Sequence, residues 1–259
     1  MSSVSVVIPS LISKPFNDVY CVENAVKSVL AQEGDATIHV YVGVDHEGKK
    51  NLPKLATDVL ARAIFINTEE HGAENVINST VKEVHTEFVA FCMDADTWEP
   101  KFLKTALPLL EEADFVASNT LQIKPDGSVV KISDFPKMSG WIMRRKLWDA
   151  VGGMNADCFA SDNEWLGRLG SVAKKRIMLV EATAPVDEWT QQVRPWLNLA
   201  RQLGVPTPRV VRHDGLKPLV NDMLFNSTKM GATSSDPQAL ADYRQSVELL
   251  TKRFGHFPW

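Results

Sequence analysis

Two aspartates one residue apart follow an apolar segment in the first half of the chain. Residues 88–93 read Phe-Val-Ala-Phe-Cys-Met, the composition of a buried strand, and Asp94 and Asp96 come directly after it. Because residues i and i+2 of an extended chain point to the same side, the two carboxylates can face one crevice. Carboxylates held so close repel each other unless a proton or a cation lies between them. The pattern predicts a divalent metal that carries substrate phosphates, and the alternative is an Asx turn before the helix at Pro100.

Two other acidic segments could take part in the same chemistry. Asp45 follows a Val-rich segment at 37–44, and at the carboxyl end of a strand it can accept hydrogen bonds from a nucleobase or ribose or cap the next turn. Asp162 stands at the expected start of a helix, where an aspartate serves either as an N-cap or as a general base. Glu164, two residues further on, is a second candidate for the base.

The elements that must position these carboxylates alternate through the first hundred residues. Expected strands cover 3–9, 37–45, 63–67 and 88–93, and expected helices cover 19–32, 52–60 and 75–85. Such alternation is typical of an α/β fold with a mostly parallel sheet and helices on both faces. The carboxyl ends of parallel strands meet at one edge, so Asp45, Asp94 and Asp96 are expected to share one crevice.

The pattern changes after an amphipathic helix expected at 102–113. Segments 115–123 and 128–132 flank a Lys-Pro-Asp-Gly turn, which predicts an antiparallel hairpin. Further elements are expected as helices near 144–151, from 161, at 193–203 and at 237–254, with a strand at 176–180. The stretch 204–235 is rich in Pro, Gly, Asn and Ser and is expected to be mobile. Trp141, Trp148 and Trp165 either flank the acceptor side or pack in the core.

The composition is that of an ordinary globular protein. The chain has 259 residues, of which 44% are hydrophobic and 23% charged, and its net charge of −4 attracts neither nucleic acid nor anionic membranes. Three cysteines without close pairing suit a reducing compartment. We find no apolar run long enough to span a bilayer, and strand-like sequence begins almost at once. We therefore expect a cytoplasmic protein without a signal peptide or transmembrane segment.

Taken in order, the motifs over residues 3–170 resemble the inverting family-two glycosyltransferases of the GT-A fold. The matching segments are the first strand with Pro9-Ser10, Asp45 after the second strand, Gly72–Asn78, Phe91–Asp96 with its metal-binding Asp-x-Asp, Arg145–Asn155 with its Gly-Gly pair, and Ser161–Leu169. The resemblance implies a GT-A (Rossmann-like) sheet, a small antiparallel subdomain on the acceptor side and a helical C-terminal extension. We expect one catalytic domain at 1–170, with a nucleotide half at about 1–100 and an acceptor half at about 101–170, and an extension at 171–259 that packs on the same domain.

The resemblance also implies roles for single residues. Those expected to bind the nucleotide-sugar donor are Pro9, Ser10, Asp45, Asn78, Asp94 and Asp96. Asp96, with Asp94 assisting, would hold Mn2+ or Mg2+, and His213 lies where related enzymes often have a late histidine that completes the metal shell. Asp162 matches the catalytic base, although Ser161 replaces the family's usual Glu and Ile77 its usual Arg. The loop after the first strand lacks the common Tyr-Asn.

The implied activity is a metal-dependent transfer of a hexosyl or pentosyl group from a nucleotide-diphosphate donor, with a UDP-sugar favoured, to an acceptor hydroxyl with inversion. A glycan or glycolipid is the expected acceptor. Residues 191–196 resemble the Gln-x-x-Arg-Trp segment of processive members, but Pro195 interrupts them, which indicates single transfers.

Three alternatives stay open on the sequence. A phage-type enzyme that glycosylates modified DNA bases could use the basic clusters at 144–146 and 174–176 to track phosphates, although such clusters are more often solvated surface. A nucleotidyltransferase uses a similar sheet but normally needs a glycine-rich loop after the first strand, which 11–18 lacks. The third alternative is a non-catalytic module that binds sugars or nucleotides.

Overall fold

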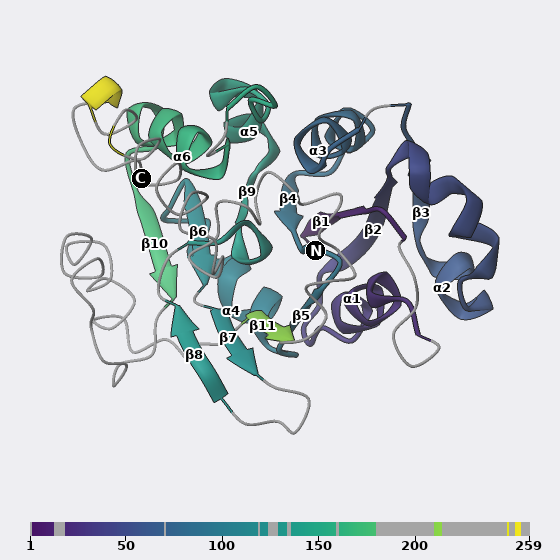
Figure 1. The fold of residues 1–259 in the computed structure, drawn as a ribbon. Coiled ribbons are helices and arrows are strands. Elements are labelled where there is room, and N and C mark those ends of the chain that lie inside the picture. The colour runs from purple at the N-terminus through teal and green to yellow at the C-terminus, as the bar shows by residue number, and fades with distance from the viewer. Residues whose placement is uncertain are drawn as a thin grey trace.

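The structure is a computed structural model that describes residues 2–12, 19–69, 71–118, 120–123, 129–133, 136–158, 161–179, 210–213, 248 and 252–254. Its main body is a seven-stranded sheet with the order β10-β6-β9-β4-β1-β2-β3 (Figure 1). The strands are β1 (Ser3–Ser10), β2 (Thr37–Val44), β3 (Ile64–Asn67), β4 (Phe88–Phe91), β6 (Phe115–Ser118), β9 (Ile142–Arg144) and β10 (Arg176–Leu179). Neighbours pair in parallel except β9, which is antiparallel to both β4 and β6. This confirms the expected α/β fold with a mostly parallel sheet.

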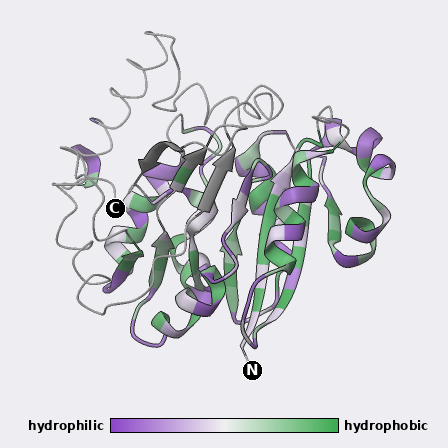
Figure 2. Cartoon of the chain, turned by 90° about the horizontal axis from the view of Figure 1, so that it is seen from below, coloured by the Kyte–Doolittle hydropathy of each residue, from purple (hydrophilic) through white to green (hydrophobic). Residues whose placement is uncertain are grey.

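Helices cover both faces of this sheet. They are α1 (Cys21–Leu30), α2 (Thr57–Arg62), α3 (Ala73–Lys82), α4 (Phe102–Leu109), α5 (Arg145–Val151) and α6 (Ser161–Val172), with the short 3-10 helices η1 (His46–Lys54) and η2 (Met138–Gly140). In Figure 1, α3, α5 and α6 lie above the sheet and α1 and α4 below it. Figure 2 shows the helices striped with hydrophobic and hydrophilic residues, as expected when one side of a helix packs on a sheet.

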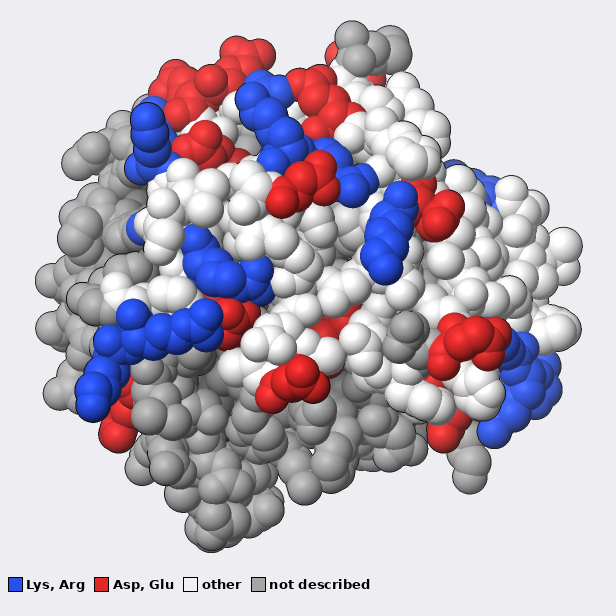
Figure 3. Space-filling view, turned by 90° about the horizontal axis from the view of Figure 1, so that it is seen from above, with Lys and Arg blue, Asp and Glu red and all other residues white. Residues whose placement is uncertain are grey.

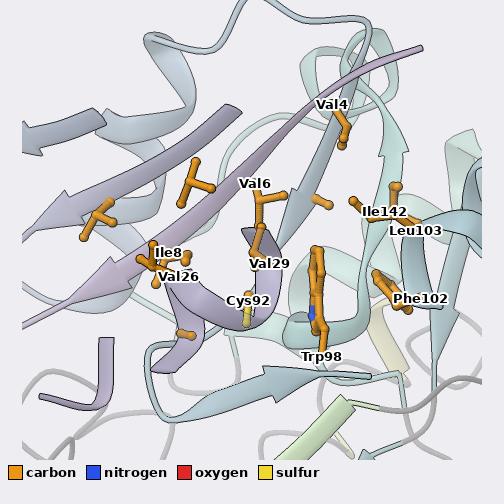
Figure 4. Close-up of a cluster of buried hydrophobic side chains, with 14 of the residues drawn as sticks. Val4, Val6, Ile8, Val26, Val29, Cys92, Trp98, Phe102, Leu103 and Ile142 are labelled. Carbon is orange, nitrogen blue, oxygen red and sulfur yellow. The ribbon is translucent and has the colours of Figure 1, made fainter. Parts of the chain in front are cut away.

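The side chains of β1 alternate between two hydrophobic cores. Val7 belongs to the core under α3, α5 and α6, whereas Val6 and Ile8 belong to the core with α1, α2 and α4. Figure 4 shows the second core, where Val26 and Val29 of α1 lie beside these strand residues. A strand that is apolar on both sides is typical of a buried parallel sheet, and each such side chain stabilises the fold by about 1.5–3 kcal/mol.

A second, four-stranded sheet lies beside the first. Its order is β5-β11-β7-β8, with β5 (Asp96–Trp98), β7 (Thr120–Ile123), β8 (Val129–Ser133) and β11 (Val210–His213). β7 and β8 form the expected antiparallel hairpin, but the segment expected as one strand at 115–123 is split, because its first half is β6 of the main sheet. β11 pairs in parallel with β7 and antiparallel with β5. Four residues of the stretch expected to be mobile thus form a strand, and the remainder of that stretch lies outside the described residues.

Other differences have local causes. The helix expected at 52–60 is divided into η1 and α2, because Pro53 lies inside the 3-10 turn and cannot continue an α-helix. β5 and β9 were not expected, since strands of three residues leave almost no periodic signal. The helices expected at 193–203 and 237–254 lie outside the described residues, except for 248 and 252–254. Within the described part of the chain, every helix is too short or too polar to cross a bilayer.

The division of the chain near residue 170 stays a prediction. β10 comes after that boundary and pairs in parallel with β6 of the main sheet. The start of the expected extension is thus part of the same sheet as the nucleotide half.

Gly43 of β2 marks the closest approach of α3 to the sheet. A Cβ atom at this position would overlap the Oγ1 of Thr80 and come within 2.8 Å of a methyl carbon of Val76. We therefore expect Gly43→Ala to lower the free energy of unfolding by about 1–3 kcal/mol, because the helix must shift to make room. Urea denaturation measures this loss, and adding Thr80→Ala should recover part of it. Equal stability of Gly43→Ala and the unsubstituted protein would contradict the close packing.

Candidate functional site

The site lies where β1, β2 and β4 end. β1 pairs in parallel with β2 on one side and β4 on the other, so the three carboxyl ends lie at one edge of the sheet. The last residue of β1, Ser10, contacts the aspartates that follow both neighbours. Its carbonyl oxygen accepts a hydrogen bond from the backbone N–H of Asp45 (3.0 Å), and its hydroxyl donates to Oδ2 of Asp94 (2.7 Å). The backbone N–H of Ile12 donates to that hydroxyl oxygen, which orients the hydroxyl proton toward Asp94.

Asp94 is a buried carboxylate with one unsatisfied oxygen. Only 4% of the residue is exposed, and its Oδ1 is buried without a hydrogen-bond partner. Burial raises the pKa of Asp94 to about 7, the hydrogen bond from Ser10 offsets part of this rise, and the neighbouring carboxylate of Asp96 adds to it. A buried polar atom without a partner is rare in folded proteins and is usually explained by a ligand, a water molecule or a catalytic role.

Asp96 is fully buried and is held by a serine from a distant segment. The hydroxyl of Ser139 donates to Oδ2 of Asp96, and its oxygen accepts a hydrogen bond from the backbone N–H of Met93 (3.0 Å). Ser139 lies in η2, before Gly140, where an added Cβ would be 2.9 Å from the carbonyl oxygen of Ser118. Sequence reasoning did not find Ser139. The signal that could have pointed to it is Gly140, the glycine that permits the close contact with the backbone of Ser118.

The donor set of this pair suits a hard divalent cation. Asp94 and Asp96 offer carboxylate oxygens, which Mg2+ and Mn2+ prefer, and among the described residues Oδ1 of Asp94 has no competing hydrogen-bond partner. Among the residues that the structure describes, no group of three His, Cys, Asp or Glu side chains could hold a metal alone. The missing ligands would therefore come from a bound phosphate, as is common for Mg2+, or from side chains beyond the described set.

The backbone brings His213 near this pair, although its side chain lies outside the described residues. β11 runs antiparallel to β5, with Arg212 opposite Asp96, and His213 is the next residue along β11. The strand that carries the expected third ligand thus lies beside the two aspartates that are expected to bind the metal. Its role as a ligand stays a prediction.

Asp45 is buried and caps the helical turn that follows it. Its Oδ1 accepts a hydrogen bond from the backbone N–H of Glu47 (3.0 Å), and its Oδ2 accepts one from Gly72 (3.2 Å). The Nδ1 of His71 lies 3.4 Å from the same Oδ1, and the His71 ring meets His46 edge to face at 5.0 Å. The capping role considered in the sequence is thus observed, while a contact to a nucleobase or ribose stays a prediction.

Asn78 is engaged within the protein. Its side-chain amide donates to the carbonyl oxygen of Met154 (2.8 Å) and accepts from the N–H of the same residue (2.7 Å). A Cβ at Gly153 would come 2.6 Å from Oδ1 of Asn78, so only glycine permits this contact. These two hydrogen bonds join α3 to the loop before α6. They favour a positioning role for Asn78 over the direct nucleotide contact that the resemblance implies.

Asp162 lies half-buried in the first turn of α6. Its Oδ1 accepts hydrogen bonds from the backbone N–H of Asn163 (2.8 Å) and from the side-chain amide of that residue (3.1 Å). Burial raises the pKa of Asp162, and the hydrogen bond from the Asn163 backbone and the positive charge of Lys137 only partly offset the rise. A carboxylate whose pKa moves toward neutrality is suited to accept a proton from a substrate hydroxyl.

Glu164, the second candidate for the base, is engaged in an ion pair with Arg168. Arg168 donates to both of its oxygens, with its Nε at 2.9 and 3.0 Å and a terminal nitrogen at 2.8 Å. Arg168 also donates to the carbonyl oxygens of Val151 (2.6 Å) and Gly153 (2.7 Å), and Arg253 lies 3.5 Å from Glu164. This network anchors α6 to the loop that precedes it. The geometry therefore favours Asp162 over Glu164 as the base.

The three tryptophans that could have flanked an acceptor pack inside the protein. Trp141 and Trp165 are fully buried with ring centroids 4.9 Å apart, and Trp148 stacks on Trp165 at 5.3 Å. The indole N–H groups of Trp141 and Trp165 donate to backbone carbonyl oxygens. These rings fill the core beneath α5 and α6 and cannot serve as stacking platforms for a sugar.

The basic clusters carry acidic partners. Arg144 pairs with Glu87, Arg145 pairs with Asp149 (3.0 Å), and Lys175 of the second cluster pairs with an exposed glutamate. Figure 3 shows Lys and Arg side chains interspersed with Asp and Glu side chains on the face seen from above. A surface of mixed sign offers little attraction to a nucleic-acid backbone.

The chain matches the family model described as glycosyl transferase family 2 over residues 5–160, more than half of its length, and belongs to that family. The sheet order and the helices on both faces are those of the GT-A fold. No curated protein sequence matches the chain.

Solved structures share this fold at low sequence identity. Residues 1–349 of S. aureus TarS in complex with UDP superpose with a TM-score of 0.56 at 16% identity, over 98% of this chain and 72% of that one. A longer TarS chain gives 0.52 at 14%, over 95% of this chain and 43% of that one. The mannosyltransferase PcManGT from Pyrobaculum calidifontis, in complex with GDP-Man and Mn2+, gives 0.50 at 14%, over 96% and 75%.

The buried ionised form of Asp94 should destabilise the metal-free protein. Its pKa is about 7 in the folded chain and near 3.8 when exposed, so the folded state loses stability as pH rises between these values. We expect Asp94→Asn, measured in EDTA, to melt at a higher temperature than the unsubstituted protein, with a difference that grows from pH 4 to pH 7. Thermal unfolding across this range measures it, and a difference that shrinks toward pH 7 would contradict the assignment.

Proposed function

We propose that this protein transfers a sugar from a nucleotide-diphosphate donor, with a UDP-sugar favoured, to an acceptor hydroxyl with inversion and with the help of Mn2+ or Mg2+. The observation that carries the proposal is the buried pair Asp94 and Asp96 at the carboxyl end of β4, with an unsatisfied oxygen on Asp94. Membership of glycosyl transferase family 2 supports it. The TarS structure in complex with UDP and the PcManGT structure in complex with GDP-Man and Mn2+ share the fold, and their ligands belong to the classes of nucleotide, nucleotide-sugar and metal proposed here.

The residues around the pair hold it ready for a cation. Ser10 donates to Asp94 and Ser139 donates to Asp96, so each carboxylate is oriented by a hydroxyl from another segment. Bound there, Mn2+ or Mg2+ would supply a Lewis acid that neutralises the departing diphosphate. Asp45, fixed by Gly72 and by the turn it caps, lies on the side of Ser10 away from Asp94 and would bind the nucleoside.

Asp162 would take the proton of the attacking acceptor hydroxyl. Both of its hydrogen bonds from Asn163 reach Oδ1, so the carboxylate is held in one orientation, and its raised pKa improves its strength as a base. The acceptor oxygen attacks the anomeric carbon as the bond to the diphosphate breaks on the opposite face, which inverts the configuration. We favour a glycan or glycolipid acceptor and single transfers, because the basic clusters required for a DNA acceptor carry acidic partners.

Metal and nucleotide should bind together. We expect UDP with Mn2+ to raise the melting temperature by several degrees at about 100 times its dissociation constant, a gain of about 2.7 kcal/mol, while UDP in EDTA has a much smaller effect. Asp96→Ala should abolish the metal-dependent part of the shift. Glu112→Ala, which removes an exposed ion pair with Lys175, is the matched control and should retain it. A protein that shows no metal-dependent shift with UDP, GDP or their sugars would contradict the proposal.

The base should be needed for turnover and dispensable for donor binding. We expect Asp162→Asn to lower the metal-dependent hydrolysis of a UDP- or GDP-sugar to nucleoside diphosphate by about 100-fold or more, with an unchanged dissociation constant for the nucleotide. In the unsubstituted protein the rate should rise with pH, through a midpoint above the ordinary range of an aspartate, because Asp162 must be ionised. Glu164→Gln should lower the melting temperature and keep measurable turnover. Full activity of Asp162→Asn would show that another residue is the base.

A further inference from the structure

Resting on the proposed function, we propose that Glu74 is a positioning residue that holds the catalytic Asp162 in place through Ser161. Glu74 lies in the first turn of α3 and Ser161 in the first turn of α6, and both are almost fully buried, at 5% and 2% exposure. The hydroxyl of Ser161 donates to Oε1 of Glu74 at 2.6 Å. The residue bonded to Glu74 is thus the chain neighbour of Asp162.

The carboxylate of Glu74 has no cation beside it. None of the ion pairs in the described part of the chain involves Glu74, whereas Glu164 of the same region is neutralised by Arg168. Burying an unneutralised carboxylate costs stability, and a glutamine could accept the same hydrogen bond without that cost. A charged acceptor makes a shorter and stronger bond to a hydroxyl, which suits a contact that must hold a neighbouring group in a narrow range of positions.

Ser161 has a short hydroxyl side chain directly before Asp162 and carries no charge of its own. Glu74 brings a carboxylate to the same place from another helix, through the bond to Ser161. The buried carboxylate next to Asp162 is therefore attached to α3 and reaches α6 through this hydrogen bond.

The helix that carries Glu74 also contacts the donor side and the loop before α6. The backbone N–H of Gly72, at the start of α3, donates to Asp45, and Asn78, one turn after Glu74, bonds to Met154. α3 is thus in contact with the expected nucleoside-binding aspartate at its N-terminal cap and with the segment of the base through its first two turns. Displacing a catalytic group by about 1 Å can cost 100-fold in rate, so this contact can affect turnover without touching a substrate.

The test compares four single variants and one double variant in the metal-dependent hydrolysis of a UDP- or GDP-sugar, well below the melting temperature of each. We expect Glu74→Ala and Ser161→Ala to lower the turnover number by about 10–100-fold with an unchanged dissociation constant for UDP in Mn2+. Glu74→Gln should retain most of the turnover, because it still accepts the hydrogen bond. Ser161→Glu alone should lower the melting temperature, because it places two carboxylates together.

The double variant Glu74→Ala/Ser161→Glu separates positioning from mere packing. It removes the carboxylate from α3 and places one on α6 without a partner on α3, so we expect turnover no higher than in Glu74→Ala and, because the two carboxylates no longer face each other, a higher melting temperature than in Ser161→Glu. Normal turnover in folded Glu74→Ala, or an equal loss of UDP binding and turnover, would overturn the positioning role alone. An unsubstituted protein without metal-dependent UDP binding or hydrolysis would overturn the proposed function and this inference with it.

Discussion

The structure depends on the burial of two neighbouring carboxylates, Asp94 and Asp96, at the end of a central strand. Water would solvate both groups well, and the protein interior solvates them poorly, so the arrangement costs stability that hydrophobic packing elsewhere must offset. Two hydroxyls, from Ser10 and Ser139, satisfy one oxygen of each carboxylate. Within the part of the chain that the structure describes, the remaining oxygen of Asp94 has no partner, and the proposed cation would satisfy it.

The sheet explains how such a pair can be built. Parallel pairing of β1 with β2 and β4 brings three carboxyl ends to one edge, where Ser10 links the two neighbouring aspartates. The antiparallel β9 then lies between β4 and β6, and η2, just before it, carries Ser139 back to Asp96. If β9 were parallel to its neighbours, the segment before it would lie at the opposite edge of the sheet. The single reversed strand therefore allows a distant segment to complete the site.

The helices above the sheet form a set of braces around α6. Asn78 of α3 bonds to Met154, Arg168 of α6 bonds to Glu164 and to the loop carbonyls, and Ser161 bonds to Glu74. Each brace uses polar side chains that are buried or half-buried. Buried hydrogen bonds have defined directions, so they can fix the orientation of α6 more narrowly than hydrophobic contact does, and Asp162 takes its position from that helix.

The sequence by itself determined the strands and helices of the nucleotide half and the order of their terminal carboxylates, because burial on both faces leaves a periodic pattern that local residues carry alone. The same pattern could not foresee that Glu164 is paired with Arg168, foresee the contacts of Ser139 and Glu74, or decide that the tryptophans fill the core. Those outcomes rest on contacts between segments far apart in the chain, such as Ser139 with Asp96 and Ser161 with Glu74. Only the tertiary structure decided them, since a partner's distance and burial are properties of the packed molecule and leave no periodic trace in the sequence.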